Sequence, residues 1–455
     1  MTETAPALKR TINLFHATMY GIGLILGAGI FVIIGDAAEI AGNLLWISFI
    51  ISSFLAICTA FSYAELSSIF PKSAAEYIYV KNSFEKLSLS IFVGCLTIFV
   101  GVVSASAVAI GFSNYLSVFL PEYPPIIFSI LIVAILSFIN FYGIRESIWF
   151  NTIFTLIELS GLVIIIFIGF IFGNFSNVNF LESPISDKMP INNNNNNFLS
   201  SIGLIFGASA LIFFAYYGFE NIPNIAEETK NPSKTISRAI LLSIIITTIV
   251  YVLVVISSLS LVTWQELSSS NVPLSLVIET VFENKGNFII SIIALFATTN
   301  TVLMMLISSS RIIYGMSKDG ALINFFSKIH KTRNTPWLAT IITALLSITV
   351  IIVSSNNISS VSKIAVFGIF TVFAFVNLSL ILLKLKKSSS YLSNSFSLLN
   401  YKRLPIFAIM GIIISFIMLL QFDSTTILSS LVIMSILFFI GVSFAKSKKI
   451  RIEKS

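Results

Sequence analysis

Two short segments of the chain combine glycine with other helix-interrupting residues inside long apolar runs. The first, residues 21–31, reads Gly-Ile-Gly-Leu-Ile-Leu-Gly-Ala-Gly-Ile-Phe and holds four glycines within nine residues. The second, residues 212–223, gathers a glycine, an acid, an amide and a proline within six residues. Glycine and proline disfavour a continuous helix, so we predict that a helix unwinds at each segment. Close helix packing through small residues is the alternative for the first segment.

Such breaks carry a specific chemistry. An unwound segment exposes backbone N–H and C=O groups, which lipid penalises, so it must line a polar cavity. The helix ends at two breaks carry partial charges of both signs, which suits a zwitterion. A carboxylate would bind the N–H groups of Ala28, Gly29 and Ile30. An ammonium group would bind the carbonyl groups of Ile25, Phe214, Ala215 and Tyr217. The predicted binding residues are Ile25, Gly27, Ala28, Gly29, Ile30, Phe214, Ala215, Tyr217 and Gly218.

Three residues at the second segment are candidates for gating this site. Tyr217 and Phe219 flank the break, and Glu220 follows it. Aromatic residues make up 13% of the chain and usually face lipid or the core, so only the position beside the break singles out these two. For Glu220, a gate or packing contact near the cytoplasmic half-channel and direct contact with a substrate are both open alternatives.

Glu158 lies alone in the middle of another apolar run, in Leu-Ile-Glu-Leu-Ser. A lone carboxylate at such a position is a functional candidate by default. Burial favours the neutral form of a carboxylate, so Glu158 could exchange a proton. It could equally bind a cation, with Thr298, Thr299 and Asn300 as oxygen donors, or be satisfied by neighbouring hydroxyls. The candidate ion-coupling residues are therefore Glu158, Thr298 and Thr299.

The composition sets the class of protein that must position these residues. Of the 455 residues, 56% are hydrophobic and only 10% are charged, against about 25% charged in soluble domains. We therefore predict a polytopic membrane protein in the lipid bilayer and exclude nucleic acid as a partner. The two cysteines, Cys58 and Cys95, lie inside apolar runs and predict no disulfide framework. The sequence shows no metal cluster, nucleophile–base pair or phosphate loop, so we expect neither a cofactor nor enzymatic activity.

Twelve apolar runs are long enough to predict membrane-spanning helices. They cover residues 14–40, 44–70, 87–119, 125–143, 148–173, 199–225, 236–262, 287–316, 337–354, 361–383, 404–422 and 426–445. The first run is too long and too rich in glycine for a cleavable signal, so we interpret it as a retained span. Of the 27 lysines and arginines, 24 lie in the two termini and the loops on their side, and only Lys188, Lys285 and Lys363 lie opposite. This bias predicts a cell-membrane protein with both termini in the cytoplasm.

The two predicted breaks are about 189 residues apart, which is five spans. Five spans between corresponding breaks is what a five-plus-five inverted repeat predicts. The first repeat would cover residues 14–173 and the second residues 199–383, with two additional helices at residues 404–445. One transmembrane domain, residues 1–455, would then contain the whole chain.

At these positions the chain resembles the amino acid–polyamine–organocation transporters. The motifs that carry the resemblance are Gly27-Ala28-Gly29-Ile30-Phe31, Tyr63-Ala64-Glu65-Leu66 with Phe70-Pro71-Lys72, the stretch Ser106–Ser113, Phe213-Phe214-Ala215-Tyr216 with Gly218-Phe219-Glu220, Ala226-Glu227-Glu228 with Lys230-Asn231-Pro232, and Ser310-Arg311-Ile312 with Tyr314-Gly315-Met316 and Asp319-Gly320-Ala321. The stretch Ser106–Ser113 is most similar to prokaryotic relatives of the cationic amino acid transporters.

The resemblance implies the leucine-transporter fold, alternating access and an amino-acid substrate. Proton-coupled relatives carry a lysine in the region of Glu158, where this chain has glutamate. We therefore expect a secondary active transporter of amino acids, with protons as the coupling ion in preference to sodium. The alternative within the same class is an exchanger of amino acids or polyamines without ion coupling. The alternative from another class is a membrane-embedded sensor that binds a substrate without moving it.

Overall fold

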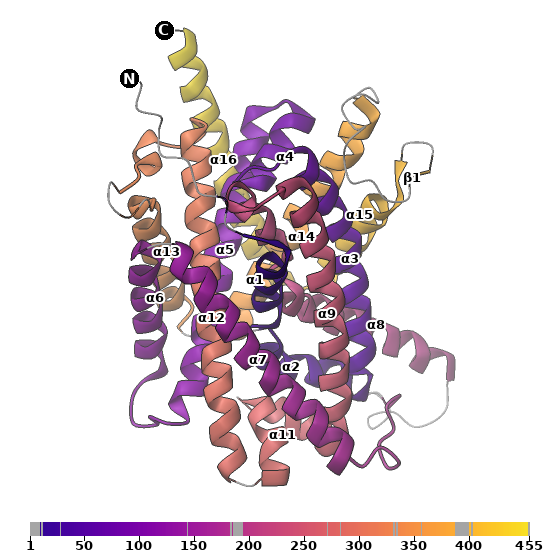
Figure 1. The fold of residues 1–455 in the computed structure, drawn as a ribbon. Coiled ribbons are helices and arrows are strands. Elements are labelled where there is room, and N and C mark those ends of the chain that lie inside the picture. The colour runs from indigo at the N-terminus through magenta and orange to yellow at the C-terminus, as the bar shows by residue number, and fades with distance from the viewer. Residues whose placement is uncertain are drawn as a thin grey trace.

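The computed structural model of the protein describes residues 10, 12–27, 29–142, 144–182, 184, 194–270, 272–282, 284–330, 333, 335–355, 357–386, 400–401 and 404–453. These residues form a bundle of long helices (Figure 1). Within them, strands are confined to one hairpin, in which β1 (Asn400–Tyr401) pairs antiparallel with β2 (Leu404–Pro405). The predicted all-helical membrane fold is confirmed.

The first part of the chain contains α1 (Leu14–Leu26), α2 (Gly29–Ala41), η1 (Gly42–Leu44), α3 (Leu45–Ile69), α4 (Ala75–Phe84), α5 (Leu87–Ser117), α6 (Pro125–Tyr142) and α7 (Ile144–Phe172). The second part contains α8 (Asn194–Tyr216), η2 (Phe219–Glu228), α9 (Pro232–Leu261), α10 (Trp264–Ser269), α11 (Pro273–Phe282), α12 (Asn284–Lys318), η3 (Asn324–Ser327), α13 (Trp337–Val353), α14 (Ile358–Lys386), α15 (Ile406–Leu419) and α16 (Ser424–Glu453). In the described part of the chain, ten helical segments are long and apolar enough to cross a membrane, and α11, α13 and α15 are shorter apolar helices. A helix lies in each of the twelve predicted runs.

Several polar side chains in these helices are hydrogen-bonded to groups one turn away in the same helix. The Asn13 side chain caps α1 by accepting a hydrogen bond from the His16 N–H at 3.0 Å. Further along, serine and threonine hydroxyls donate to a carbonyl one turn earlier, as Ser106 does to Val102 and Thr247 to Ser243, both at 2.8 Å. Such bonds pair these two hydroxyls within their own helices.

The helix α1 lies in the middle of the bundle, where other helices surround it (Figure 1). It packs against α7, α9 and α12, while α3 packs against α8 and α9, and α5 against α12 and α14. The residues of α1 from Ala17 to Leu26 are all buried. An interruption of α1 is therefore shielded from lipid by its neighbours.

Both predicted helix breaks are present. The regular helix of α1 ends at Leu26, Gly27 has φ −37° and ψ −86°, and α2 begins at Gly29. The second break follows α8, where Gly218 has φ +146°, a conformation that favours glycine. The chain then continues as the 3₁₀ segment η2, with Pro223 inside it.

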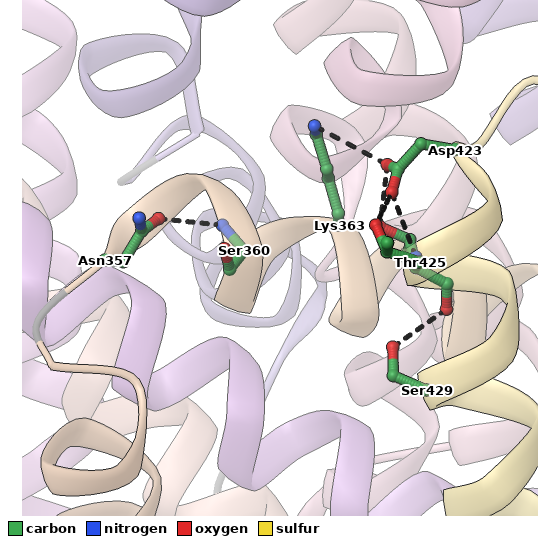
Figure 2. Close-up of polar contacts among 7 residues, drawn as sticks. Asn357, Ser360, Lys363, Asp423, Thr425 and Ser429 are labelled. Carbon is green, nitrogen blue, oxygen red and sulfur yellow. Dashed lines mark hydrogen bonds and ion pairs between the residues drawn. The ribbon is translucent and has the colours of Figure 1, made fainter.

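A polar cluster joins α14 to the start of α16, as Figure 2 shows. The Lys363 Nζ lies 3.7 Å from the Asp423 carboxylate. Asp423 also caps α16, because its carboxylate accepts hydrogen bonds from the Thr425 hydroxyl and from the Thr426 N–H and hydroxyl, the last two at 3.0 and 2.8 Å. These hydrogen bonds, with the Lys363 charge, hold the pKa of Asp423 below its usual range. The cluster fixes the last helix against the bundle.

Candidate functional site

The two helix breaks lie against each other in the middle of the bundle. A Cβ added at Gly29 would lie 2.2 Å from the Cα and 2.6 Å from the Cβ of Ala215, at the end of α8. A Cβ added at Gly218 would lie 2.9 Å from the carbonyl carbon of Leu24, at the end of α1. Real Cβ atoms essentially never approach other atoms closer than 3.0 Å. At each break, the residue that contacts the other broken helix is therefore a glycine.

One hydroxyl group ties the carbonyl groups of the two breaks together. Tyr251 of α9 is fully buried, and its hydroxyl contacts the carbonyl oxygen of Ile25 and, at 2.9 Å, the carbonyl oxygen of Ala215. Carbonyl groups at a helix C-terminus lack partners within the helix, so this donor satisfies them. The Tyr251 ring packs edge-on against Tyr216 and Phe49, with ring centroids 5.3 and 5.6 Å away. These contacts fix the hydroxyl between the breaks.

The predicted binding residues gather in this region. Ile25, Ile30, Phe214, Ala215 and Tyr217 are all buried. Gly27 faces α12, because an added Cβ would lie 1.6 Å from the Thr301 hydroxyl oxygen. Ala28 lies outside the described residues. Gly29 and Gly218 make the close approaches given above, and the assignment of a substrate carboxylate and ammonium to these backbone groups stays a prediction.

Glu220 holds the second break in its unwound form. Its carboxylate accepts hydrogen bonds from the Gly218 N–H at 2.9 Å and from the Asn221 amide at 2.6 Å. The Asn221 amide oxygen accepts in turn from the Ser308 hydroxyl of α12, and the Asn224 amide donates to the same hydroxyl at 3.2 Å. These contacts correspond to the packing alternative given for Glu220 above. A role in gating stays a prediction.

The two aromatic gating candidates are buried beside the break. Tyr217 is 4% exposed, and its N–H donates to the carbonyl oxygens of Phe213 and Phe214 at 3.1 and 3.3 Å. Phe219 is fully buried, with its ring 5.8 Å from Tyr63 and 5.4 Å from Phe373. The Phe219 ring therefore lies between the break and Tyr63 of α3.

The turn between α3 and α4 covers η2 on that side. The Ser73 hydroxyl donates to the Asn224 carbonyl oxygen at 3.2 Å, and the Ala75 N–H donates to the Asn224 side chain at 3.4 Å. Glu76 follows and is buried, with one carboxylate oxygen accepting from the Tyr63 hydroxyl at 3.1 Å. Burial raises the pKa of Glu76 to about 7, although the hydrogen bond from Tyr63 lowers it.

Tyr251 and Glu76 were not among the site residues predicted from the sequence. A tyrosine inside an apolar run gives no signal that its hydroxyl reaches two distant carbonyls. Glu76 follows a short polar turn, and nothing in its spacing indicates that the turn is buried. The proline and the adjacent small residues, Pro71 to Ala75, were the available hint of a compact turn.

The ion-coupling candidates are only partly brought together. Glu158 of α7 is fully buried, and both carboxylate oxygens lack a hydrogen-bond partner among the described residues. The Thr298 hydroxyl donates to the Ala294 carbonyl oxygen of its own helix at 2.7 Å, and Thr299 is half-buried. Of the three predicted oxygen donors, Asn300 is the one with a hydrogen bond to α7, since its amide lies 3.5 Å from the Thr155 hydroxyl. Ion coupling through these residues stays a prediction.

A bundle of apolar helices in which two interrupted helices meet at a buried site is typical of secondary membrane transporters. The family model described as amino acid permease matches residues 12–450. The chain therefore belongs to the amino acid permease family, and the resemblance found in the sequence is confirmed. It is a multi-pass membrane transporter and not an enzyme.

Several characterised proteins are similar over most of the chain. The branched-chain amino acid permease BcaP of Bacillus subtilis is 29% identical over 406 residues, which cover 85% of this chain and 83% of that protein. The methylthioribose transporter of the same organism is 29% identical over 403 residues, covering 84% and 82%. The human cationic amino acid transporter 4 is 26% identical over 408 residues, covering 84% of this chain and 61% of that protein.

Proposed function

We propose that the protein is a secondary active transporter that imports amino acids by alternating access and couples their entry to protons. The observation that carries the proposal is the meeting of the two helix breaks. Gly29 contacts Ala215, Gly218 contacts Leu24, and Tyr251 holds carbonyl groups from both breaks. A site built from the backbone of two interrupted helices suits the α-amino and α-carboxylate groups that all amino acids share.

The substrate would bind with its two charged groups on opposite sides of the breaks. Its carboxylate would accept from the N–H groups at the start of α2, where the helix end carries a positive partial charge. Its ammonium group would donate to the carbonyl groups of Ile25 and Ala215. Each carbonyl oxygen has two lone pairs, so the ammonium can bind beside the Tyr251 hydroxyl. The side chain of Tyr251 would thereby orient both acceptors toward the substrate.

The proposed topology has twelve spans, a five-plus-five inverted repeat in residues 14–173 and 199–383, and additional helices in residues 404–445. The positions of the two breaks, five helical runs apart, support the repeat. The α1 helix begins and α16 ends at the same end of the bundle (Figure 1), as an even number of spans requires. The excess of lysine and arginine on that side supports cytoplasmic termini in the cell membrane.

Proton coupling is proposed to act through Glu158. A carboxylate buried without a partner is costly to keep ionised, and binding of a proton removes that cost. The cycle would load a proton and an amino acid from outside and release both to the cytoplasm. Sodium held by Glu158 with Thr298 and Thr299 is the less favoured coupling ion.

The test is uptake of labelled substrates by proteoliposomes that contain the purified protein, with the lumen at higher pH than the outside. We expect accumulation of amino acids above the no-gradient control. The panel includes branched-chain and cationic amino acids, and methylthioribose because one relative is named for it. Uptake that requires preloaded amino acid would instead establish exchange and overturn proton symport. Uptake that requires external sodium would reassign the coupling ion.

A further inference from the structure

A line of polar side chains runs along one face of α7 below Glu158. Asn151, Thr155 and Glu158 are spaced four and three residues apart, so they share one face of the helix. All three are completely buried. Asn151 lies about 10 Å along the helix axis from Glu158, toward the end of the bundle where α7 begins. A carboxylic acid buried in a membrane helix is a functional candidate by default, and here two amide or hydroxyl side chains share its face.

This polar face meets α1 at a glycine and α12 at an asparagine. A Cβ added at Gly23 would lie 2.1 Å from the Thr155 hydroxyl oxygen, 2.8 Å from the Asn300 amide nitrogen and 2.9 Å from the Asn151 amide oxygen. Three polar side chains from two helices therefore converge on the bare backbone of Gly23. The absence of a side chain at Gly23 leaves the space in which they meet.

Several polar atoms beside Gly23 and further along the same face of α7 have no partner among the described residues. Beside Gly23 they are both amide atoms of Asn151 and the amide oxygen of Asn300, and further along α7 they are both carboxylate oxygens of Glu158. The Thr155 hydroxyl is paired, since it donates to the Asn151 carbonyl oxygen at 2.7 Å. Buried polar groups are almost always hydrogen-bonded to protein or to ordered water. Water is therefore the natural partner of these atoms.

The line continues toward the aqueous phase along α1. His16 precedes Gly23 by seven residues, so the two share one face of α1. The residue is half-buried, and its Nδ1 atom is buried with no hydrogen-bond partner in the described part of the chain. His16 lies in the first turn of α1, at the end of the bundle where α7 also begins (Figure 1).

Among the titratable side chains of the neighbouring helices, Tyr251 is the one that interacts with Glu158. The described titratable side chains on the helices that pack against α7 are His16 and Tyr20 of α1, Tyr142 of α6, Lys234, Arg238 and Tyr251 of α9, Glu279 of α11, and Arg311, Tyr314 and Lys318 of α12. Of these, Tyr251 interacts electrostatically with Glu158. Tyr20 and Arg311 interact with Glu228 of η2 instead. A proton on Glu158 therefore faces no competing cation.

We propose that Asn151, Thr155 and Asn300 hold a short chain of water molecules that conducts protons between Glu158 and the cytoplasmic end of α1 and α7, with His16 at its mouth. The proposal rests on the proton symport proposed above and assigns the route by which the proton leaves. The O–H bond of the Glu158 carboxyl breaks, its proton passes to the adjacent water, and one proton is released to bulk water at His16. Glu158 is left as a carboxylate until the next proton binds from the opposite side.

The test compares two substitutions of Asn151 in the full chain reconstituted in proteoliposomes. Asn151→Leu fills the polar space with an apolar side chain, whereas Asn151→Ser keeps a hydroxyl and leaves room for water. Asn377→Leu is the matched control, because Asn377 is also a buried asparagine, bound to Thr59 at 3.2 Å between α14 and α3. Each protein is assayed with a mixture of labelled amino acids for pH-driven uptake and for counterflow. A pH-sensitive dye in the lumen reports proton movement when the mixture is added.

We expect Asn151→Leu to lower pH-driven uptake and substrate-triggered proton movement about tenfold or more, and to leave counterflow close to wild type. Asn151→Ser and Asn377→Leu should keep all three activities. Wild-type levels of proton movement in Asn151→Leu would overturn the proposed route, as would an equal loss of counterflow. A wild-type protein that performs counterflow but ignores the pH gradient would refute proton symport itself, and the route with it.

Discussion

The backbone of Gly29 lies so close to Ala215 that a Cβ at position 29 would be 2.2 Å from the Ala215 Cα. This contact joins the start of α2 to the end of α8 and so joins the two halves of the candidate site. Because both partners are backbone atoms, neither can move aside as a flexible side chain would. The contact therefore restricts position 29 to glycine for a geometric reason.

We predict that Gly29→Val weakens substrate binding strongly while the protein still reaches the membrane. Overpacking costs about 1–3 kcal/mol, and a cost of this size at the binding site corresponds to roughly 5- to 140-fold weaker binding. Scintillation proximity binding of labelled amino acids to the purified protein measures the loss. Gly203→Val is the control, because Gly203 of α8 has no atom within 4 Å of an added Cβ. Retained affinity in Gly29→Val would count decisively against the site.

Tyr251→Phe should weaken substrate binding, because it removes the hydroxyl that holds the carbonyl groups of Ile25 and Ala215. A buried polar group left without its partner costs about 1–3 kcal/mol. The change keeps the ring and its packing. The same binding assay is applied to Tyr216→Phe, which removes a hydroxyl bound to Phe49 at 3.1 Å and away from Ile25 and Ala215. Equal affinities for the two variants would refute a specific role for Tyr251.

The sequence predicted local features well and contacts between distant residues poorly. Glycine spacing located the breaks at Gly27 and Gly218, because backbone conformation depends on the residues that adopt it. Apolar runs located the helices, because lipid requires about 20 apolar residues for a span. The short helices α4 and α10 were missed, since they are polar and lack a membrane-length run.

The contacts that complete the site depend on helix packing. The Tyr251 hydroxyl reaches Ile25 across 226 residues of sequence, and the Asn300 amide reaches Thr155 across 145. No periodicity in one segment indicates which side chain of another segment faces it. Thr298, Thr299 and Asn300 were predicted together as oxygen donors, and the sequence did not indicate which of them faces α7. A helix turns by 100° at each residue, so Asn300 contacts α7 although it lies only two positions beyond Thr298.

Glu158→Gln should abolish uptake driven by a pH gradient and spare exchange. The amide keeps the size and polarity of the buried side chain, whose two carboxylate oxygens lack described partners, but it cannot exchange a proton at neutral pH. Uptake and counterflow are measured in the same batch of proteoliposomes, so that protein content cancels. Unchanged pH-driven uptake in this variant would exclude Glu158 as the coupling group.

Glu76 should make the packing of the α3–α4 turn against η2 depend on pH. In the closed arrangement the turn covers η2 and Glu76 is buried, and in the open arrangement Glu76 reaches water. Its pKa is about 7 in the closed arrangement because of burial, against an ordinary 4.5 when the carboxyl reaches water. The closed form binds more protons between these values, so its stability falls as pH rises from 4.5 to 7, by about 1.4 kcal/mol per unit, and is constant outside them. Maleimide labelling of a cysteine at Ser73 should therefore speed up with pH over this range.

Two variants test the assignment of this pH dependence to Glu76. Each labelling rate is divided by that of a small thiol in solution at the same pH, which removes the rise in thiolate. Glu76→Gln is neutral at every pH, so this ratio should be flat, whereas it should rise with pH in the protein that keeps Glu76. Tyr63→Phe removes the hydrogen bond that lowers the pKa of Glu76, so the upper limit of the pH dependence should move to higher pH. Cys58 and Cys95 are buried and are replaced to give a clean background. A pH dependence that survives in Glu76→Gln would assign it to another group.

Lys384→Met should destabilise the protein strongly, because Lys384 and Glu65 form a buried ion pair at 2.7 Å between α14 and α3. Removal of one partner leaves a buried charge and costs about 3–5 kcal/mol. The double variant Glu65→Leu with Lys384→Met removes both charges and should recover much of the thermal stability measured in detergent. Lys81→Met, in the half-exposed Lys81–Asp319 pair, should cost only about 0–1 kcal/mol. A double variant no more stable than Lys384→Met would show that the pair, and not the isolated charge, carries the stability.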